Sequence, residues 1–154
     1  MGGLLLPQAK WRLIVTEPAD GATNMAIDQA IAEAVAQGEV LPTLRFYSWH
    51  PACVSLGQSQ SAALLDLNRC TALGWDIVRR ATGGRTVLHI DELTYSIIAP
   101  ENEPRVKGGV LASYQRLSLG LQAGLEAAGL LPKQASNDKT PPLERSQIGQ
   151  IQSR

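Results

Sequence analysis

The chain is poor in cysteine. Its 154 residues include only two, Cys53 and Cys70, and neither belongs to a Cys-x-x-Cys pair or to a Cys/His spacing typical of zinc. Both lie among apolar residues, where a free thiol is usually buried and unreactive because nothing stabilises its thiolate. We therefore expect two buried cysteines, favour this over a reactive thiol, and predict no metal site.

The sequence also lacks an excess of charge and a long apolar run. With 14 basic and 14 acidic residues the formal net charge is zero, so no overall field attracts nucleic acid or an acidic membrane. No apolar run approaches the roughly 20 residues that cross a bilayer. The N-terminal segment has neither the basic leader nor the apolar run of roughly 7–15 residues found in secretory signals. We expect a cytoplasmic protein that binds neither nucleic acid nor membrane.

What the sequence does contain is an irregular alternation of strand-like and helix-like segments. Alternating apolar residues predict strands at 11–16, 43–49, 52–56, 75–79, 86–89 and 93–99. Helical spacing predicts helices at 25–37, with Thr23 or Asn24 as N-cap, and at 62–73 and 110–128. Segments 43–49 and 52–56 predict a hairpin or a corner. The pattern favours an α/β (α+β) domain with a mixed, mainly antiparallel sheet flanked by helices.

The last part of the chain differs in composition. Residues 132–154 hold three prolines and many Gln, Ser, Asn and Lys residues, with too little apolar surface to offset the entropy of ordering. We predict one domain over residues 1–131 and a poorly ordered tail over residues 132–154.

The most informative segment is the glycine turn at residues 81–84. Gly83 and Gly84 allow backbone amides to approach a ligand, and successive N–H donors in a turn form an anion-binding nest. Permanently charged, bidentate donors flank the turn, namely Arg79, Arg80 and Arg85. The arrangement suits a carboxylate, an acyl phosphate or a phosphopantetheine phosphate. An equally weighted alternative is a tight β-hairpin turn with solvated arginines.

Other polar and aromatic side chains follow or precede this turn. His89 can donate a proton or orient a ligand, although a structural hydrogen-bonding role is favoured. Asp91 and Glu92 can carry acid/base chemistry, although two solvated acids in a turn are the favoured interpretation. Three aromatic residues can line the floor of an acyl pocket, namely Phe46, Tyr47 and Trp49. Packing in the core explains them at least as well.

Several ordered motifs together resemble the lipoate/octanoate transferase and ligase family, whose class II synthetase-like fold is shared with biotin protein ligases. One is Arg79-Arg80-Ala81-Thr82-Gly83-Gly84-Arg85 through His89, followed by Glu92-Leu93-Thr94-Tyr95-Ser96. Similar motifs lie at residues 24–28, 44–49, 54–60 and 112–114. The resemblance extends over roughly residues 10 to 130.

The resemblance implies a mixed sheet that cradles a medium-chain acyl group and passes it to a lysine of a carrier domain, such as the H protein or a dehydrogenase E2 subunit. Burial of the acyl tail would contribute about 0.8 kcal/mol per methylene. The implied acyl and head-group binding residues are Arg79, Arg80, Thr82, Gly83, Gly84, Arg85, Thr86 and Val87, with His89 at the border of the pocket.

Arg85 stands where lipoate ligases of the family usually have a third glycine. The resemblance therefore favours the octanoyltransferase branch, which takes octanoate from acyl carrier protein through a cysteine thioester and needs no ATP or other cofactor. Two alternatives stay open. One is a lipoate-protein ligase, which would use lipoate and ATP, and the other is a non-catalytic module that binds acyl groups or carrier domains.

The sequence departs from the family where the chemistry is expected. The family's essential lysine and the thioester cysteine both follow the long helix, and here Gln147 occupies the position that weakly matches the lysine. An amide cannot replace an ammonium group as a charge stabiliser or base. We assign no catalytic residue, expect a C-terminally truncated member or an acyl-binding remnant, and expect apolar faces to be exposed.

Overall fold

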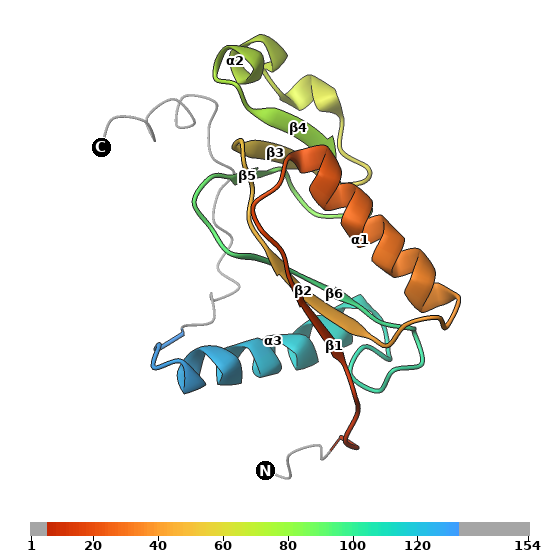
Figure 1. The fold of residues 1–154 in the computed structure, drawn as a ribbon. Coiled ribbons are helices and arrows are strands. Elements are labelled where there is room, and N and C mark those ends of the chain that lie inside the picture. The colour runs from red at the N-terminus through yellow and green to blue at the C-terminus, as the bar shows by residue number, and fades with distance from the viewer. Residues whose placement is uncertain (1–5, 133–154) are drawn as a thin grey trace. The chain divides into compact units, whose positions relative to one another are not determined.

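The computed structural model describes residues 6–132 (Figure 1). Its elements are β1 (Arg12–Val15), α1 (Gly21–Ala36), β2 (Thr43–Tyr47), β3 (Cys53–Leu56), the 3₁₀ turn η1 (Ala62–Leu64), α2 (Leu67–Ala72), β4 (Asp76–Arg79), β5 (Val87–His89), β6 (Thr94–Ile98) and α3 (Val110–Ala127). The chain forms two compact units, Met1–Arg116 and Leu117–Arg154, and the first contains every one of these strands. The predicted tail lies outside the described residues except for Pro132.

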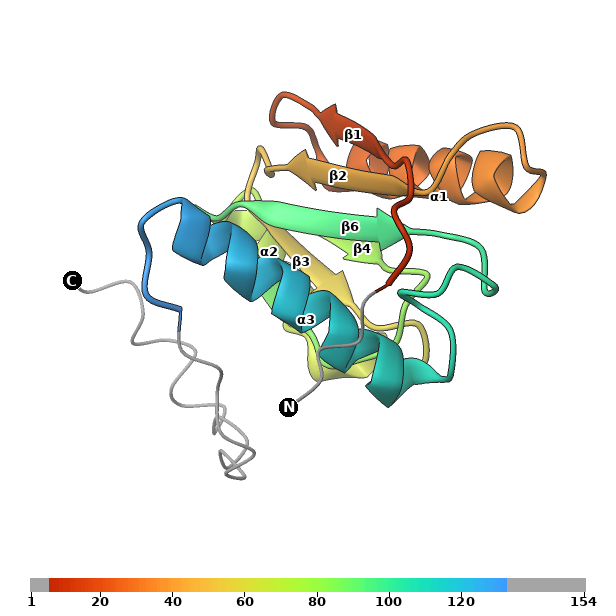
Figure 2. The ribbon, with the colours of Figure 1, turned by 90° about the horizontal axis from the view of Figure 1, so that it is seen from below.

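The strands form two mixed three-stranded sheets, in the orders β1-β2-β6 and β4-β3-β5 (Figures 1 and 2). In each sheet the central strand has one parallel and one antiparallel neighbour. The parallel pairs are β1 with β2 and β3 with β4, and each pair is joined through a helix, because a crossover is needed to return the chain in the same direction. The predicted mixed α/β fold is confirmed, with as many parallel as antiparallel pairs among the described strands.

Two connections differ from hairpins. Strands β2 and β3 belong to different sheets, so the segment around the cis His50–Pro51 bond is a corner between sheets. Strands β4 and β5 lie on opposite sides of β3, so the glycine turn crosses from one edge of that sheet to the other. The hairpin interpretation of the glycine turn is therefore wrong. Successive strands need not pair when a third strand supplies hydrogen bonds to both.

Helix α1 begins earlier than predicted. Asp20 is its N-cap, and the carboxylate accepts a hydrogen bond from the backbone N–H of Thr23 at 2.8 Å, which is the usual role of Asp before the first helical turn. Asn24, one of the predicted caps, is fully buried instead. The predicted helix at 62–73 is also divided, since η1 ends before Asp66, which caps α2.

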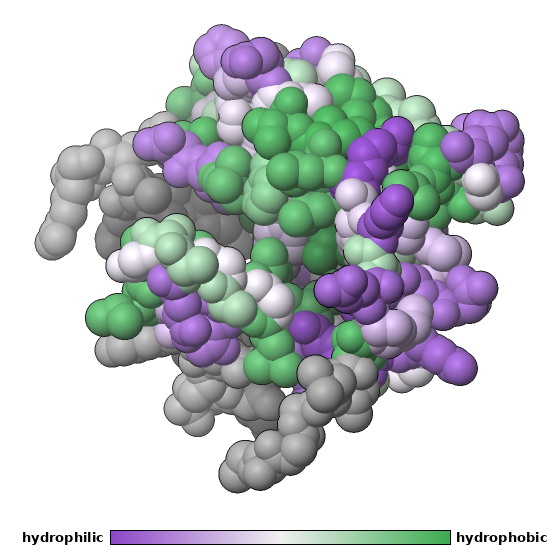
Figure 3. Space-filling model, turned by 60° about the horizontal axis from the view of Figure 1, so that its bottom comes forward, coloured by the Kyte–Doolittle hydropathy of each residue, from purple (hydrophilic) through white to green (hydrophobic). Residues whose placement is uncertain are grey.

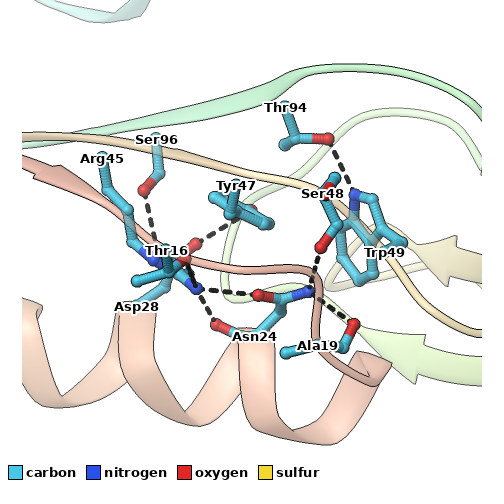
Figure 4. A network of polar contacts seen from close by, with 10 residues as sticks. All are labelled: Thr16, Ala19, Asn24, Asp28, Arg45, Tyr47, Ser48, Trp49, Thr94 and Ser96. Atoms are coloured by element: carbon cyan, nitrogen blue, oxygen red, sulfur yellow. Dashed lines mark hydrogen bonds and ion pairs between the residues drawn. The ribbon is translucent and has the colours of Figure 1, made fainter.

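The contact between α1 and the first sheet is polar as well as apolar (Figure 4). Arg45, on β2, is fully buried and donates to Asp28 Oδ1 at 2.9 Å and to Asn24 Oδ1 at 2.7 Å. Tyr47 and Ser96 also donate to the Asp28 carboxylate. We call the side chains joined in this way the Arg45 network, namely Thr16, Asn24, Asp28, Arg45, Tyr47 and Ser96.

The other face of this sheet is apolar and partly open. Burial alternates along β1, and its outward residues Leu13 and Val15 are 62% and 71% exposed. Tyr95, on β6, is 43% exposed and pairs with Phe46 of β2. Figure 3 shows apolar side chains gathered on the surface of the molecule. The expected exposure of apolar sheet surface is thus confirmed for the first sheet.

The N-terminus of α1 connects this sheet to the second one. A Cβ atom on Gly21 would lie 2.7 Å from both Cys53 Sγ on β3 and Val78 Cγ1 on β4. The backbone N–H of Gly21 donates to Asp76 Oδ2 at 2.9 Å. Glycine at this position therefore lets the helix approach β3 and β4 of the second sheet.

Candidate functional site

The glycine turn packs backbone against backbone on the segment that follows β3. Gln58 N–H donates to Thr82 O at 2.9 Å, and Arg80 N–H donates to Leu56 O at the same distance. A Cβ atom on Gly57 would lie 2.2 Å from Gly84 O, which no side chain can tolerate. Gly84 itself has a φ of +98°, a conformation that favours glycine. Gly57, which was not among the predicted site residues, is therefore required for this approach.

Arg79 holds the segment after β3. Its Nη1 donates to the carbonyls of Gly57, Gln58 and Gln60 at 2.8, 3.1 and 2.7 Å. Gln60 completes the link, because its side-chain oxygen accepts from Gly57 N–H at 2.9 Å and from Thr86 Oγ1 at 3.1 Å. Thr86, at the C-terminal end of the glycine turn, is thereby hydrogen bonded to the segment after β3.

Arg80 holds the glycine turn itself. Its Nη1 donates to the carbonyl and the hydroxyl of Ser55 at 2.8 and 2.6 Å. Its Nη2 donates to the carbonyls of Gly83 and Arg85 at 3.1 and 2.9 Å. Much of the guanidinium's hydrogen-bonding capacity is thus used by the chain, and a direct grip of Arg79 and Arg80 on a ligand stays a prediction.

The remaining predicted residues form the outer part of the turn. Thr82, Gly83, Gly84 and Arg85 are exposed, and Val87 is 40% exposed. A Cβ atom on Gly83 would meet no heavy atom within 4 Å. The structure therefore brings these predicted head-group residues together in one exposed loop, two carbonyls of which are held by Arg80.

His89 lies beneath this loop and is buried, with 6% exposure. Its Nε2 is 2.6 Å from Ser55 Oγ, and its Nδ1 is hydrogen bonded to Glu92 Oε1. The ring stacks on Trp49 with centroids 4.2 Å apart. The favoured hydrogen-bonding role of His89 is confirmed, and its place at the border of an acyl pocket stays a prediction.

The two acids after β5 have different environments. Both are exposed, but Glu92 also accepts hydrogen bonds from His89 and from Thr94 Oγ1, the latter at 2.8 Å. Burial opposes ionisation of the Glu92 carboxyl, but the hydrogen bonds from His89 and Thr94 outweigh it and lower its pKa below the usual value. The expectation that both acids are merely solvated is therefore wrong for Glu92.

The aromatic residues favour the core-packing interpretation. Tyr47 and Trp49 are buried, and their ring centroids are 5.5 Å apart. Trp49 Nε1 donates to Thr94 Oγ1 at 2.7 Å, which gives this buried indole a partner. Phe46 is on the opposite face of β2 and is half-buried.

Both cysteines are buried and free, as predicted. Burial raises the pKa of Cys53 to about 12, and the nearby charges of Asp76 and Asp20 act in the same direction. Burial, with the charge of Asp66, also raises the pKa of Cys70. Neither thiol is suited to attack an acyl donor, because the thiolate is the reactive form.

Within residues 6–132, no three His, Cys, Asp or Glu side chains are grouped to hold a metal ion, and no helix is long and apolar enough to cross a membrane. Sequence reasoning missed Ser55 and Gln60 as parts of the site, and it favoured a solvated role for Glu92. The only signal for them was their position inside motifs that resemble the family, since a serine, a glutamine and an acid in a turn carry no distinctive pattern.

Comparison with known proteins places this geometry in context. Residues 20–144 match the family described as lipoyl protein ligase A/B catalytic domain. The octanoyltransferase LipM of Exiguobacterium sibiricum is 50% identical over 122 residues, which cover 79% of this chain and 44% of that protein. LipM of Clostridioides difficile is 47% identical, with 79% and 45% covered. The chain spans about half the length of the curated relatives it matches.

Solved structures show the same fold. A lipoate-protein ligase A bound with ATP matches with a TM-score of 0.67 and 26% identity, over 88% of this chain and 54% of that one. A structure of a bi-partite lipoate protein ligase and its E2 lipoyl domain from Thermoplasma acidophilum matches with a TM-score of 0.68 and 24% identity, over 84% and 49%. The chain belongs to the lipoyl protein ligase A/B catalytic domain family.

Proposed function

We propose that this chain forms the acyl-binding part of an octanoyltransferase that acts in protein lipoylation. The reaction would move an octanoyl group from the thioester of an acyl carrier protein to a lysine amine of a lipoyl carrier domain. An amide bond forms, the thioester bond breaks, and the carrier thiol is released. The acceptor would be an H protein or an E2 subunit.

The observation that carries this proposal is the high identity to proteins named octanoyltransferase. Relatives with that name are 43–50% identical over most of this chain, whereas the ligase structures described above are 24–26% identical. Arg85, in the place of a third glycine, favours the same branch. ATP is not required for a transfer between a thioester and an amine.

The loop offers hydrogen-bond donors for the polar, carbonyl end of an acyl group. Its exposed residues, Thr82 to Arg85, present backbone amides and one exposed guanidinium, while Arg80 holds two of its carbonyls and Arg79 holds the adjacent segment after β3. A prearranged loop loses little conformational entropy when it binds, so more of the interaction energy contributes to affinity. The buried cysteines supply no nucleophile, so we assign binding, and not bond cleavage, to these residues.

A lipoate-protein ligase is the second candidate, because a ligase bound with ATP has the same fold at a TM-score of 0.67. Such an enzyme would form an adenylate from lipoate before the transfer. A non-catalytic module that binds acyl groups or carrier domains is the third candidate.

Mass spectrometry of a lipoyl domain, incubated with octanoyl carrier protein and this chain, separates the candidates. We expect no octanoylation by the chain alone, together with measurable binding of octanoate by calorimetry. Octanoylation by the chain alone would show that it contains the complete chemistry. Adenylate formed from lipoate and ATP would favour the ligase. Absence of octanoate binding would refute the proposed acyl site.

A further inference from the structure

A continuous path of hydrogen bonds runs beneath the glycine turn. Arg80 Nη1 is 2.6 Å from Ser55 Oγ, which is 2.6 Å from His89 Nε2, and His89 Nδ1 contacts the Glu92 carboxylate. The four residues come from the loop after β4, from β3, from β5 and from the turn after β5. With the carbonyls of Gly83 and Arg85 they form what we call the Arg80 network, and the path connects Glu92 to the exposed loop.

The chemistry of the two ends fixes the direction of the two outer bonds, and the direction of the Ser55–His89 bond follows for a neutral imidazole. A guanidinium only donates and an ionised carboxylate only accepts. Ser55 Oγ therefore accepts from Arg80, and its single hydrogen is available for His89 Nε2. The neutral His89 ring then carries its proton on Nδ1 and donates it to Glu92. A second proton on Nε2 would reverse the Ser55 bond, so that Ser55 Oγ would have to accept from both His89 and Arg80.

Glu92 is itself held in place by a hydrogen bond, and the two residues in the middle of the path, Ser55 and His89, are buried. Thr94 Oγ1 donates to Glu92 at 2.8 Å, and Trp49 donates to Thr94 at 2.7 Å while it stacks on the His89 ring. Ser55 is fully buried and His89 nearly so. The charged or titratable groups near the ring are Arg80, through Ser55, Glu92, and Tyr47, which is packed on Trp49 and is close enough to feel the Glu92 charge.

The order of serine, histidine and carboxylate is that of a nucleophile, a base and an orienting acid. Two observations exclude that use in this conformation. Ser55 has no exposed surface through which an acyl donor can reach Oγ, and Arg80 already donates a hydrogen bond to Oγ. The path therefore orients the side chains from Glu92 to Arg80, and Ser55 does not act as a nucleophile.

We propose, on the basis of the proposed acyl-binding function, that Glu92 is a positioning residue for the glycine turn. Its carboxylate keeps the His89 proton on Nδ1, which directs the Ser55 hydroxyl toward His89 and leaves Ser55 Oγ free to accept from Arg80. Arg80 then keeps its other nitrogen on the carbonyls of Gly83 and Arg85. Glu92 acts on the ligand only through this chain of side chains.

The test compares Glu92→Gln with Asp91→Asn in the full chain. Asp91 is the adjacent, exposed acid, so its substitution removes the same charge from the same turn. In Glu92→Gln the amide can either donate or accept, and His89 loses its fixed tautomer. We expect changed ¹⁵N chemical shifts of the His89 ring, displaced amide signals of Gly83 and Gly84, and about tenfold weaker octanoate binding. Asp91→Asn should leave all three unchanged.

Each readout has a separate meaning. Altered His89 nitrogen shifts with unchanged glycine amides would overturn the proposal, because the path would end before the loop. Equal effects of both substitutions would also overturn it, since charge alone would explain them. Altered glycine amides in a chain whose wild type binds no octanoate would support the path and refute the acyl-binding function.

A second variant covers the case in which Glu92→Gln does not fold. Ser55→Ala breaks the path between His89 and Arg80 and leaves Glu92 in place. We expect it to displace the Gly83 and Gly84 amide signals while the His89 Nδ1 signal keeps its hydrogen-bonded shift. Unmoved glycine signals in this variant would overturn the proposal independently.

Discussion

Two arginine networks in this molecule use similar chemistry for different ends. Arg45 is fully buried, and it joins α1 to the first sheet through Asp28 and Asn24. Arg80 lies at the end of the second sheet, and it joins buried Ser55 to an exposed loop. Both guanidinium groups donate to backbone carbonyls and to side-chain oxygens. A buried network thus fixes the packing of elements, whereas one that reaches the surface holds the shape of an exposed loop.

The two networks therefore predict different consequences of substitution. Loss of a buried partner leaves an uncompensated charge or an unsatisfied polar group, which costs stability. Disturbance of the exposed loop should alter ligand binding more than stability. The predictions below test this division.

The largest effect on stability is expected for Arg45→Met. The substitution leaves the Asp28 carboxylate, whose side chain is only 21% exposed, without its ion partner. Removal of one partner of a buried pair typically costs about 3–5 kcal/mol. Urea denaturation, followed by circular dichroism, measures the free energy of unfolding. Arg69→Met, on the exposed side of α2, is the matched control and should change it little. Equal stability of the two variants would show that the buried network contributes nothing.

An intermediate effect is expected for Gly57→Ala. The new Cβ would lie 2.2 Å from Gly84 O, so one of the two backbone segments must move. We expect a loss of about 1–3 kcal/mol of stability and weaker octanoate binding. Gly83→Ala is the control for stability, because a Cβ there meets no atom within 4 Å and the backbone φ is not positive. If Gly57→Ala binds octanoate as well as the wild type, the close contact of these segments does not shape the site.

The smallest effect is expected for the pH dependence of Glu92. Its pKa in the folded chain is lower than the ordinary 4.5, so the folded state favours the carboxylate. The resulting stability is present above the ordinary pKa and is lost as the pH falls through the lowered value. The side chain is 39% exposed, and solvent screening keeps the contribution small.

Denaturation at pH 7 and at about pH 3 measures this contribution. Wild type should be more stable than Glu92→Gln at neutral pH, and the difference should shrink in acid as the carboxylate is protonated. Asp91→Asn should show no such trend. A difference that grew in acid would contradict the assigned direction of the pKa shift.

The sequence predicted the elements better than their partners. Alternation along 43–49 located β2 to within two residues at its end, and helical spacing located α3 to within one residue at its end. The pairing of β4 and β5 with β3, in contrast, is not visible in any local pattern, since both strands have similar apolar residues. The sequence therefore identified residues 81–84 correctly as a turn. The alternative in which the flanking strands β4 and β5 pair as a hairpin was wrong.

The candidate site shows the same division. Gly83, Gly84 and the arginines were identifiable because their side chains, or lack of them, have a narrow chemical use. Ser55 and Glu92 have many uses, and only their contacts with His89 distinguish them. The role of Gly57 could be recognised only from the position of the Gly84 carbonyl, which lies 27 residues further along the chain.

By itself, the sequence determined the mixed α/β character, the buried cysteines and the glycine-arginine loop, because periodicity and residue chemistry act over short distances. Only the tertiary structure decided which strands pair, which carbonyls Arg79 and Arg80 hold, and how Glu92 reaches the loop through His89 and Ser55. Those features depend on distances and directions between residues far apart in the chain, and these are set when the sheets and α1 pack together.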